Sequence, residues 1–202
     1  MEVTKERYEE YLNQILNMYY QSKSYFALFD LLNKKRKDSL GKLNLSPGFF
    51  NIVTMSLVDG IILSLSKILE KKRRSFSIYK FINISKANQQ LLNNFPKKDF
   101  QSGIIERVDK NTFAEFIVEL DKYVDLVNKL FDFRNEFTAH LDYNSLKKKK
   151  SITLPENEIE SLLNILHKII CKISVAFNGS SWSKEKGGTR DLEILLNNIK
   201  TA

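Results

Sequence analysis

Cysteine and turn-forming residues are scarce in this chain of 202 residues. It contains 7 glycines, 3 prolines and one cysteine, Cys171. An all-β fold needs more glycine and proline at its turns, so this composition argues against it and favours helices. A single cysteine excludes an internal disulfide. The apolar residues around Cys171 predict that its thiol is buried and inert rather than reactive.

Long hydrophobic runs are also missing. The N-terminus has no apolar segment of the kind found in signal peptides, and no stretch reaches the roughly 18 uninterrupted apolar residues of a membrane span. We therefore expect a cytoplasmic protein with no membrane partner. Hydrophobic residues make up 43% of the chain, enough to build the core of one domain over residues 1–202. No internal repeat or linker indicates a second domain.

Positive charge is in excess. The chain has 32 Lys and Arg against 24 Asp and Glu, which gives a net charge of +8 and a pI near 9.4. Such a surface favours a polyanionic partner, and nucleic acid fits better than a membrane. A bias toward lysine and asparagine is also typical of an AT-rich genome, so charge alone is a weak argument.

The hydrophobic pattern predicts an all-α bundle. Apolar residues recur mostly at spacings of three and four, as one face of a helix requires. Ser46-Pro47 begins one helix, Thr112 and Glu115 form a capping box for another, and Gly60 is expected to permit a close helix crossing. The predicted helices span about residues 4–33, 46–69, 77–94, 112–134, 155–177 and 191–199.

One segment, residues 133–142, concentrates the reactive side chains. It reads Phe-Arg-Asn-Glu-Phe-Thr-Ala-His-Leu-Asp, and it holds one of only two histidines in the chain. Arg134 offers a fixed cation, Asn135 an amide, His140 a proton carrier near neutral pH and Asp142 a carboxylate. This combination suits phosphate-ester chemistry.

Spacing limits how the two main groups of this segment meet. Six residues of helix advance about 600°, so Arg134 and His140 point about 120° apart and lie about 9 Å apart along the axis. They converge on one phosphate only if the helix deforms, or if a second copy of the chain presents its own Arg and His across a twofold axis.

The same segment resembles the signature of the HEPN superfamily, small helical proteins with an Arg and a His four to six residues apart. Arg134-Asn135 followed by Ala-His-Leu-Asp at 139–142 is most similar to its abortive-infection, AbiU-type branch. The apolar run 61–69 and the Ser-Phe-Ser-Ile that follows at 75–78 resemble the central helix of those proteins and its sequel. Glu136 departs from the branch pattern, which often has a basic residue there.

The resemblance implies an HEPN-like helical bundle that acts as a metal-independent endoribonuclease of a prokaryotic antiviral or toxin system. It also implies a homodimer with a composite cleft, and an antitoxin that is either an inhibitory protein or a nucleotidyltransferase. No cofactor is expected. The expected catalytic residues are Arg134, Asn135 and His140, and the expected RNA-binding residues are Asp142, Tyr143, Lys147 and Lys148.

Two alternatives stay open. Asp132, Glu136 and His140 share one helical face and could hold a divalent metal, although they span about 12 Å, too far to close around one ion alone. The second alternative is a non-catalytic HEPN-like module that binds RNA or nucleotide, or pairs with a protein. The other histidine, His167, lies in an apolar helix and is expected to have a structural role.

Overall fold

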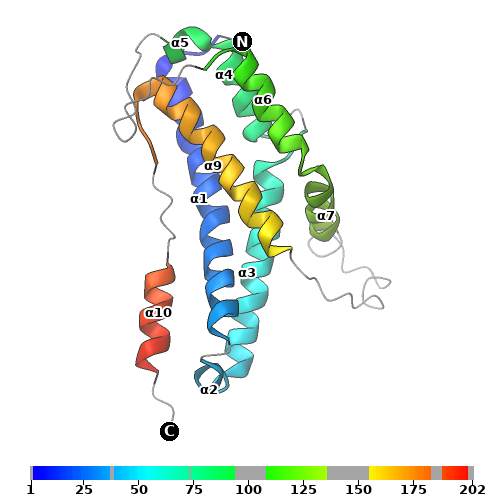
Figure 1. Ribbon diagram of the computed structural model, residues 1–202, viewed down its shortest axis with the longest axis vertical. Helices are drawn as coiled ribbons and strands as arrows, with labels where there is room; N and C mark the ends of the chain where they lie inside the picture. Colours follow the sequence, from blue (N-terminus) through cyan, green and yellow to red (C-terminus); the bar gives the residue numbers. More distant parts are fainter. Residues whose placement is uncertain are drawn as a thin grey trace.

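A computed structural model describes residues 2–36, 39–72, 74–93, 108–135, 155–182 and 188–199. Within these ranges the chain forms α-helices and no β-strand, which confirms the all-α prediction (Figure 1). The helices are α1 (Lys5–Lys35), α2 (Leu40–Leu43), α3 (Pro47–Ile68), α4 (Ile78–Ala87), α5 (Gln89–Asn93), α6 (Lys110–Asp121), α7 (Val124–Arg134), α9 (Glu156–Asn178) and α10 (Thr189–Asn198).

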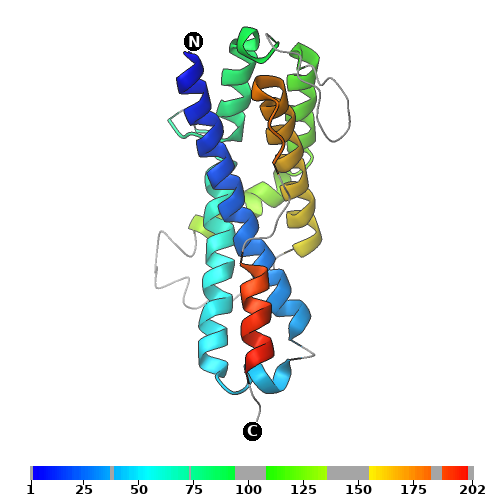
Figure 2. The same cartoon turned by 90° about the vertical axis from the view of Figure 1, so that its left-hand side faces the viewer.

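The long helix α1 is the axis of the structure. Thr4 caps it, because the Thr4 hydroxyl accepts a hydrogen bond from the Arg7 backbone N–H at 3.3 Å. Its buried side chains, among them Tyr8, Ile15 and Tyr19, recur at helical spacing. Helices α3, α4, α9 and α10 all pack against α1, and α10 lies beside its C-terminal half (Figures 1 and 2).

Helix α3 runs alongside α1, and Gly60 sits at the point of contact. A Cβ atom at Gly60 would lie 2.8 Å from the ring of Tyr25 on α1. Only glycine leaves room on α3 for this ring, so the close contact between α1 and α3 that we expected at Gly60 is confirmed. The N-terminal half of α3 is less enclosed than its C-terminal half, because Phe49, Ile52 and Met55 are exposed.

The length and composition of α3 also match those of a membrane-crossing helix. Only 28% of its 18-residue apolar window is buried inside the structure. However, the charged residue Asp59 lies within the helix. The face of α3 that carries its buried side chains packs on α1. The same length and composition occur in core helices of proteins that enter no membrane.

The predicted helix 112–134 is in fact two helices. Helix α6 ends at Asp121 and α7 begins at Val124, with no Pro or Gly at the break. The break lets α6 pack against α4 and α9 while α7 turns to pack against α3, so each apolar stripe finds its own partner. Our expected capping box was wrong as well: Asp109 is the N-cap, and its carboxylate accepts the Thr112 backbone N–H at 2.8 Å.

Buried Asn88 divides the predicted helix 77–94 into α4 and α5. Its side-chain Nδ2 donates to the Ile84 carbonyl at 2.8 Å, and its Oδ1 accepts the Val3 backbone N–H at 3.0 Å. Asn88 therefore ends α4 and holds the N-terminal segment against it. Ser77 caps α4, because its hydroxyl accepts the Lys80 backbone N–H at 3.4 Å.

Helix α9 supplies the other large apolar face. Leu162, Leu166, Ile169 and Ile173 are fully buried and follow the helical period. Gly179 ends the helix in the left-handed conformation, with φ of 74°, and its N–H donates to the Val175 carbonyl at 2.9 Å. This helix matches the predicted span 155–177 closely.

Candidate active site around Arg134

The last turn of α7 carries Arg134. Leu126, Val127 and Leu130 are buried and hold α7 against the rest of the fold. The Ser66 hydroxyl of α3 also donates a hydrogen bond to the Leu130 carbonyl at 3.4 Å. The backbone that carries Arg134 is therefore fixed by packing and by this contact, as a catalytic side chain requires.

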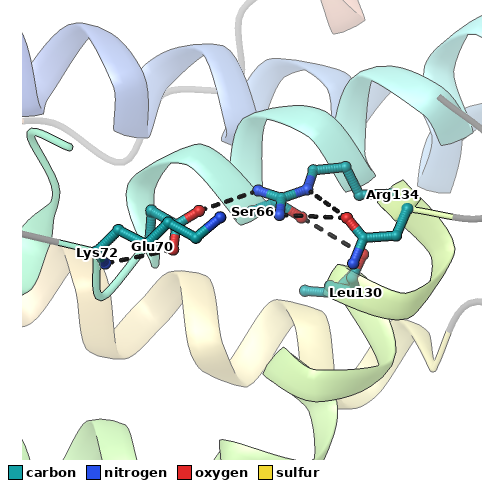
Figure 3. Close-up of polar contacts among 6 residues, drawn as sticks. Ser66, Glu70, Lys72, Leu130 and Arg134 are labelled. Atoms are coloured by element: carbon teal, nitrogen blue, oxygen red, sulfur yellow. Dashed lines mark hydrogen bonds and ion pairs between the residues drawn. The ribbon is translucent and has the colours of Figure 1, made fainter. Parts of the chain in front are cut away.

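Three groups hold the Arg134 guanidinium, and Figure 3 shows the polar contacts among them. Its Nη1 donates to Glu70 Oε2 at 3.2 Å, and its Nε and Nη2 both lie 3.4 Å from Asn135 Oδ1. Its Cζ stands 4.6 Å from the centre of the Phe131 ring, a cation–π contact. These contacts fix both the plane and the position of the cation.

Glu70, the acidic partner, was not predicted from the sequence. It lies just past the end of α3, and its other oxygen, Oε1, accepts the Lys72 backbone N–H at 3.3 Å. The Glu70 side chain is 14% exposed and that of Arg134 is 24% exposed, so the ion pair is largely shielded from water. Glu70 and Arg134 are 64 positions apart in the sequence, so no local pattern links them. The only hint was one carboxylate immediately before a run of four cations at 71–74.

Lys71, the first residue of that basic run, contacts residues of α6 and α4. Lys71 Nζ lies 3.1 Å from Asp121 Oδ1 and 4.7 Å from the centre of the Tyr79 ring. Burial raises the pKa of the Tyr79 phenol, while the nearby Lys71 lowers it. Lys71 therefore links α3 to α6 and α4, and its charge is balanced by Asp121.

The structure places two of the predicted site residues. Arg134 and Asn135 lie side by side at the end of α7, where Asn135 Oδ1 accepts from the guanidinium. His140, Asp142, Tyr143, Lys147 and Lys148 lie outside the described residues. Of the alternative metal face, Asp132 is described and exposed, whereas Glu136 and His140 are not described.

The second histidine has the structural environment expected for it. His167 Nε2 lies 2.9 Å from the Trp182 carbonyl oxygen, and Trp182 Nε1 donates to the Ser174 hydroxyl at 2.8 Å. These contacts tie the segment after α9 back onto that helix. Cys171 is half-buried rather than buried, with Sγ 3.4 Å from His167 Nε2.

Comparison with known proteins identifies the family. No curated protein and no solved structure gives a significant match to the chain. A family model does match: HEPN_AbiU2, described as AbiU2, covers residues 5–196, which includes every described helix from α1 to α9 and most of α10. The match takes in both the Arg134 segment and the α3 run that carry the resemblance seen in the sequence. The chain therefore belongs to the HEPN_AbiU2 family, within the HEPN superfamily.

Proposed function

We propose that this protein is a metal-independent endoribonuclease that uses Arg134 and His140. The observation that carries the proposal is the fixed guanidinium of Arg134, held by Glu70, Phe131 and Asn135 at the end of a packed helix. A guanidinium fixed in this way stabilises charge that develops on a phosphate without having to reorganise. His140, six residues further on, supplies the proton transfer.

In the proposed reaction a ribose 2′-OH attacks the adjacent phosphorus. His140 takes the 2′-OH proton as general base or, in its protonated form, gives a proton to the leaving 5′ oxygen. Arg134 stabilises the added negative charge on the phosphate, and Asn135 keeps the guanidinium in place. The P–O5′ bond breaks, leaving a 2′,3′-cyclic phosphate on one product and a 5′-OH on the other. Neither a metal nor a cofactor takes part.

The residues proposed to contact RNA come shortly after His140 in the sequence. Lys147 and Lys148 neutralise backbone phosphates, Tyr143 stacks on a base, and Asp142 positions the substrate. We further propose that the protein works as a cytoplasmic homodimer in which each copy contributes to the cleft. Membership of HEPN_AbiU2 supports an abortive-infection setting, with a protein or nucleotidyltransferase antitoxin as partner.

Single-stranded RNA incubated with purified protein in excess EDTA tests the chemistry. We expect cleavage products with a 2′,3′-cyclic phosphate, and no cleavage where the 2′-OH is replaced by hydrogen. His140→Ala or Arg134→Ala should lower the rate about a hundredfold or more. Arg190→Ala, an exposed arginine on α10, is the matched control and should leave the rate unchanged. Cleavage that EDTA abolishes and a divalent ion restores would contradict the proposal and favour the Asp132, Glu136 and His140 face.

A second candidate function is a non-catalytic HEPN-like module. The ion pair favours it, because Glu70 already balances the charge of Arg134 inside the protein. This candidate predicts that RNA is bound in the same assay but not cut, with or without metal. Turnover that depends on His140 would rule it out.

A further inference from the structure

The two faces of α3 differ sharply. Toward α1 the helix buries Leu57, Ile61, Leu65 and Ile68. Within a 120° arc on another side it exposes four large apolar side chains, which we call the α3 stripe. The exposed fractions in the α3 stripe are 58% for Phe49, 65% for Ile52, 60% for Met55 and 43% for Leu63.

The amount of apolar surface in the α3 stripe is large for a single helix. Together the four side chains expose on the order of 400 Å², in the range of patches that mark an interaction site. A stable protein interface takes about 800 Å² from each partner, of which rather more than half is apolar. The α3 stripe thus supplies most of the apolar area that one side of a dimer needs.

The chemistry of the surrounding surface restricts what covers the α3 stripe. From Pro47 to Ser66 the chain has no Lys or Arg, and its one charge is Asp59. Asp59 is exposed and falls within the arc of the α3 stripe. RNA needs cations, and a helix lying in a membrane interface typically has basic residues along its polar side. A carboxylate amid the apolar side chains opposes both, so a protein surface fits better. When two such stripes dock antiparallel about Ser56, the two Asp59 positions lie about 9 Å apart along the axis and do not face each other.

We infer that the α3 stripe is the surface on which a second copy of this chain docks. Small Ser56 lies in the same arc between the large residues, so an identical stripe offers both side chains to insert and space to receive them. The stripe is also continuous with the candidate active site. Leu63 precedes Ser66 by about 4.5 Å along the axis, and at Ser66 α3 contacts the α7 helix that carries Arg134. A docked copy thus reaches the neighbourhood of that site. The inference rests on the homodimer of the proposed function but not on its cleavage chemistry.

The test measures solution mass by light scattering at micromolar concentration. Wild-type protein should give about twice the 23.6 kDa chain mass. The triple variant Phe49→Gln, Ile52→Gln, Met55→Gln should give the mass of one chain, with an unchanged far-ultraviolet circular dichroism spectrum because all three side chains are exposed. The matched control, Val118→Gln with Val124→Gln, removes exposed apolar side chains on α6 and α7 and should remain dimeric.

Two results would overturn the inference: a triple variant that stays dimeric, or a wild-type protein that is monomeric. In the second case, flotation with phosphatidylglycerol-containing vesicles shows whether the α3 stripe binds lipid instead.

Repeating the mass measurement in an Arg134→Ala background separates the docking surface from the proposed RNA cleavage. Loss of the dimer in the triple variant supports the docking surface even if the wild-type protein cuts no RNA. RNA cleavage by a monomeric wild-type protein would leave the chemistry intact and remove the docking surface.

Discussion

At the scale of single residues, Arg134 is both a candidate catalytic cation and half of an ion pair. The pair with Glu70 is only 14–24% exposed, between a solvent-screened surface pair and a fully buried one. A carboxylate at this distance holds the guanidinium in one place but also opposes its attraction for a phosphate. Phosphate binding is therefore expected to displace the Arg134 guanidinium from Glu70, or from Asn135 Oδ1, which accepts from Nε and Nη2.

Substituting Glu70 tests how much its carboxylate stabilises the fold by holding Arg134. Glu70→Ala is expected to lower the free energy of unfolding by about 1–2 kcal/mol, because it leaves the shielded Arg134 charge without its partner. Glu70→Gln keeps a hydrogen-bond acceptor and should cost less. Urea denaturation measures both. The control is Asp121→Ala, which breaks the Lys71 pair whose side chains are 57% and 50% exposed, and it should cost under about 0.5 kcal/mol. Equal losses for Glu70→Ala and Asp121→Ala would mean that the Arg134 pair contributes no more than a surface pair.

Asp109 makes a pH-dependent contribution at the start of α6. Its pKa is lowered from 3.8, chiefly because the Thr112 backbone N–H donates to its carboxylate. A carboxyl group whose pKa is lower in the folded state stabilises the fold above its unfolded pKa and loses that effect as pH falls through the folded value. Thermal melts should thus show wild type more stable than Asp109→Ala at pH 6, with the difference shrinking below about pH 4. A difference that stays constant down to pH 2 would contradict the assignment.

At the scale of elements, the close packing of α1 and α3 depends on Gly60. Gly60→Ala should destabilise the protein by about 1–3 kcal/mol, since the new Cβ would stand 2.8 Å from the Tyr25 ring. Gly48→Ala is the matched control on the same helix, because nothing lies within 4 Å of a Cβ there. It should be neutral or stabilising by up to about 1 kcal/mol. Urea denaturation compares the two, and a neutral Gly60→Ala would show that Tyr25 moves aside at little cost.

The helices themselves could be predicted from the sequence because their signals are local. Apolar spacing and the Ser46-Pro47 start located α3 and α9 almost to the residue. The break between α6 and α7 could not be found this way. It depends on which helix each apolar stripe meets, and neither Lys122 nor Tyr123 is a helix breaker. Arg134 could be identified because its motif, residues 133–142, is also local in sequence. Glu70 reaches Arg134 only through the tertiary packing of α3 and α7.

At the scale of the whole molecule, the net charge of +8 predicts a polyanionic ligand but not where it binds. The described cations are partly committed to internal pairs: Lys34 with Asp30, Lys71 with Asp121, Lys168 with Glu119 and Arg134 with Glu70. In the sequence, residues 147–150 are four consecutive lysines, and no acidic residue lies between Asp142 and Glu156.

The salt dependence of RNA binding tests whether those lysines form the contact. Each phosphate neutralised on a single strand adds about 0.7 to the slope of log affinity against log salt. Replacing Lys147 and Lys148 by Ala should lower that slope by about 1.4, measured by fluorescence anisotropy with an RNA whose 2′-OH groups are replaced so that it is not cut. The control replaces Lys80 and Lys86, exposed lysines on α4, and should leave the slope unchanged. An equal decrease in the salt slope for the two double variants would mean that RNA is attracted by the overall charge and not held at the segment that follows His140.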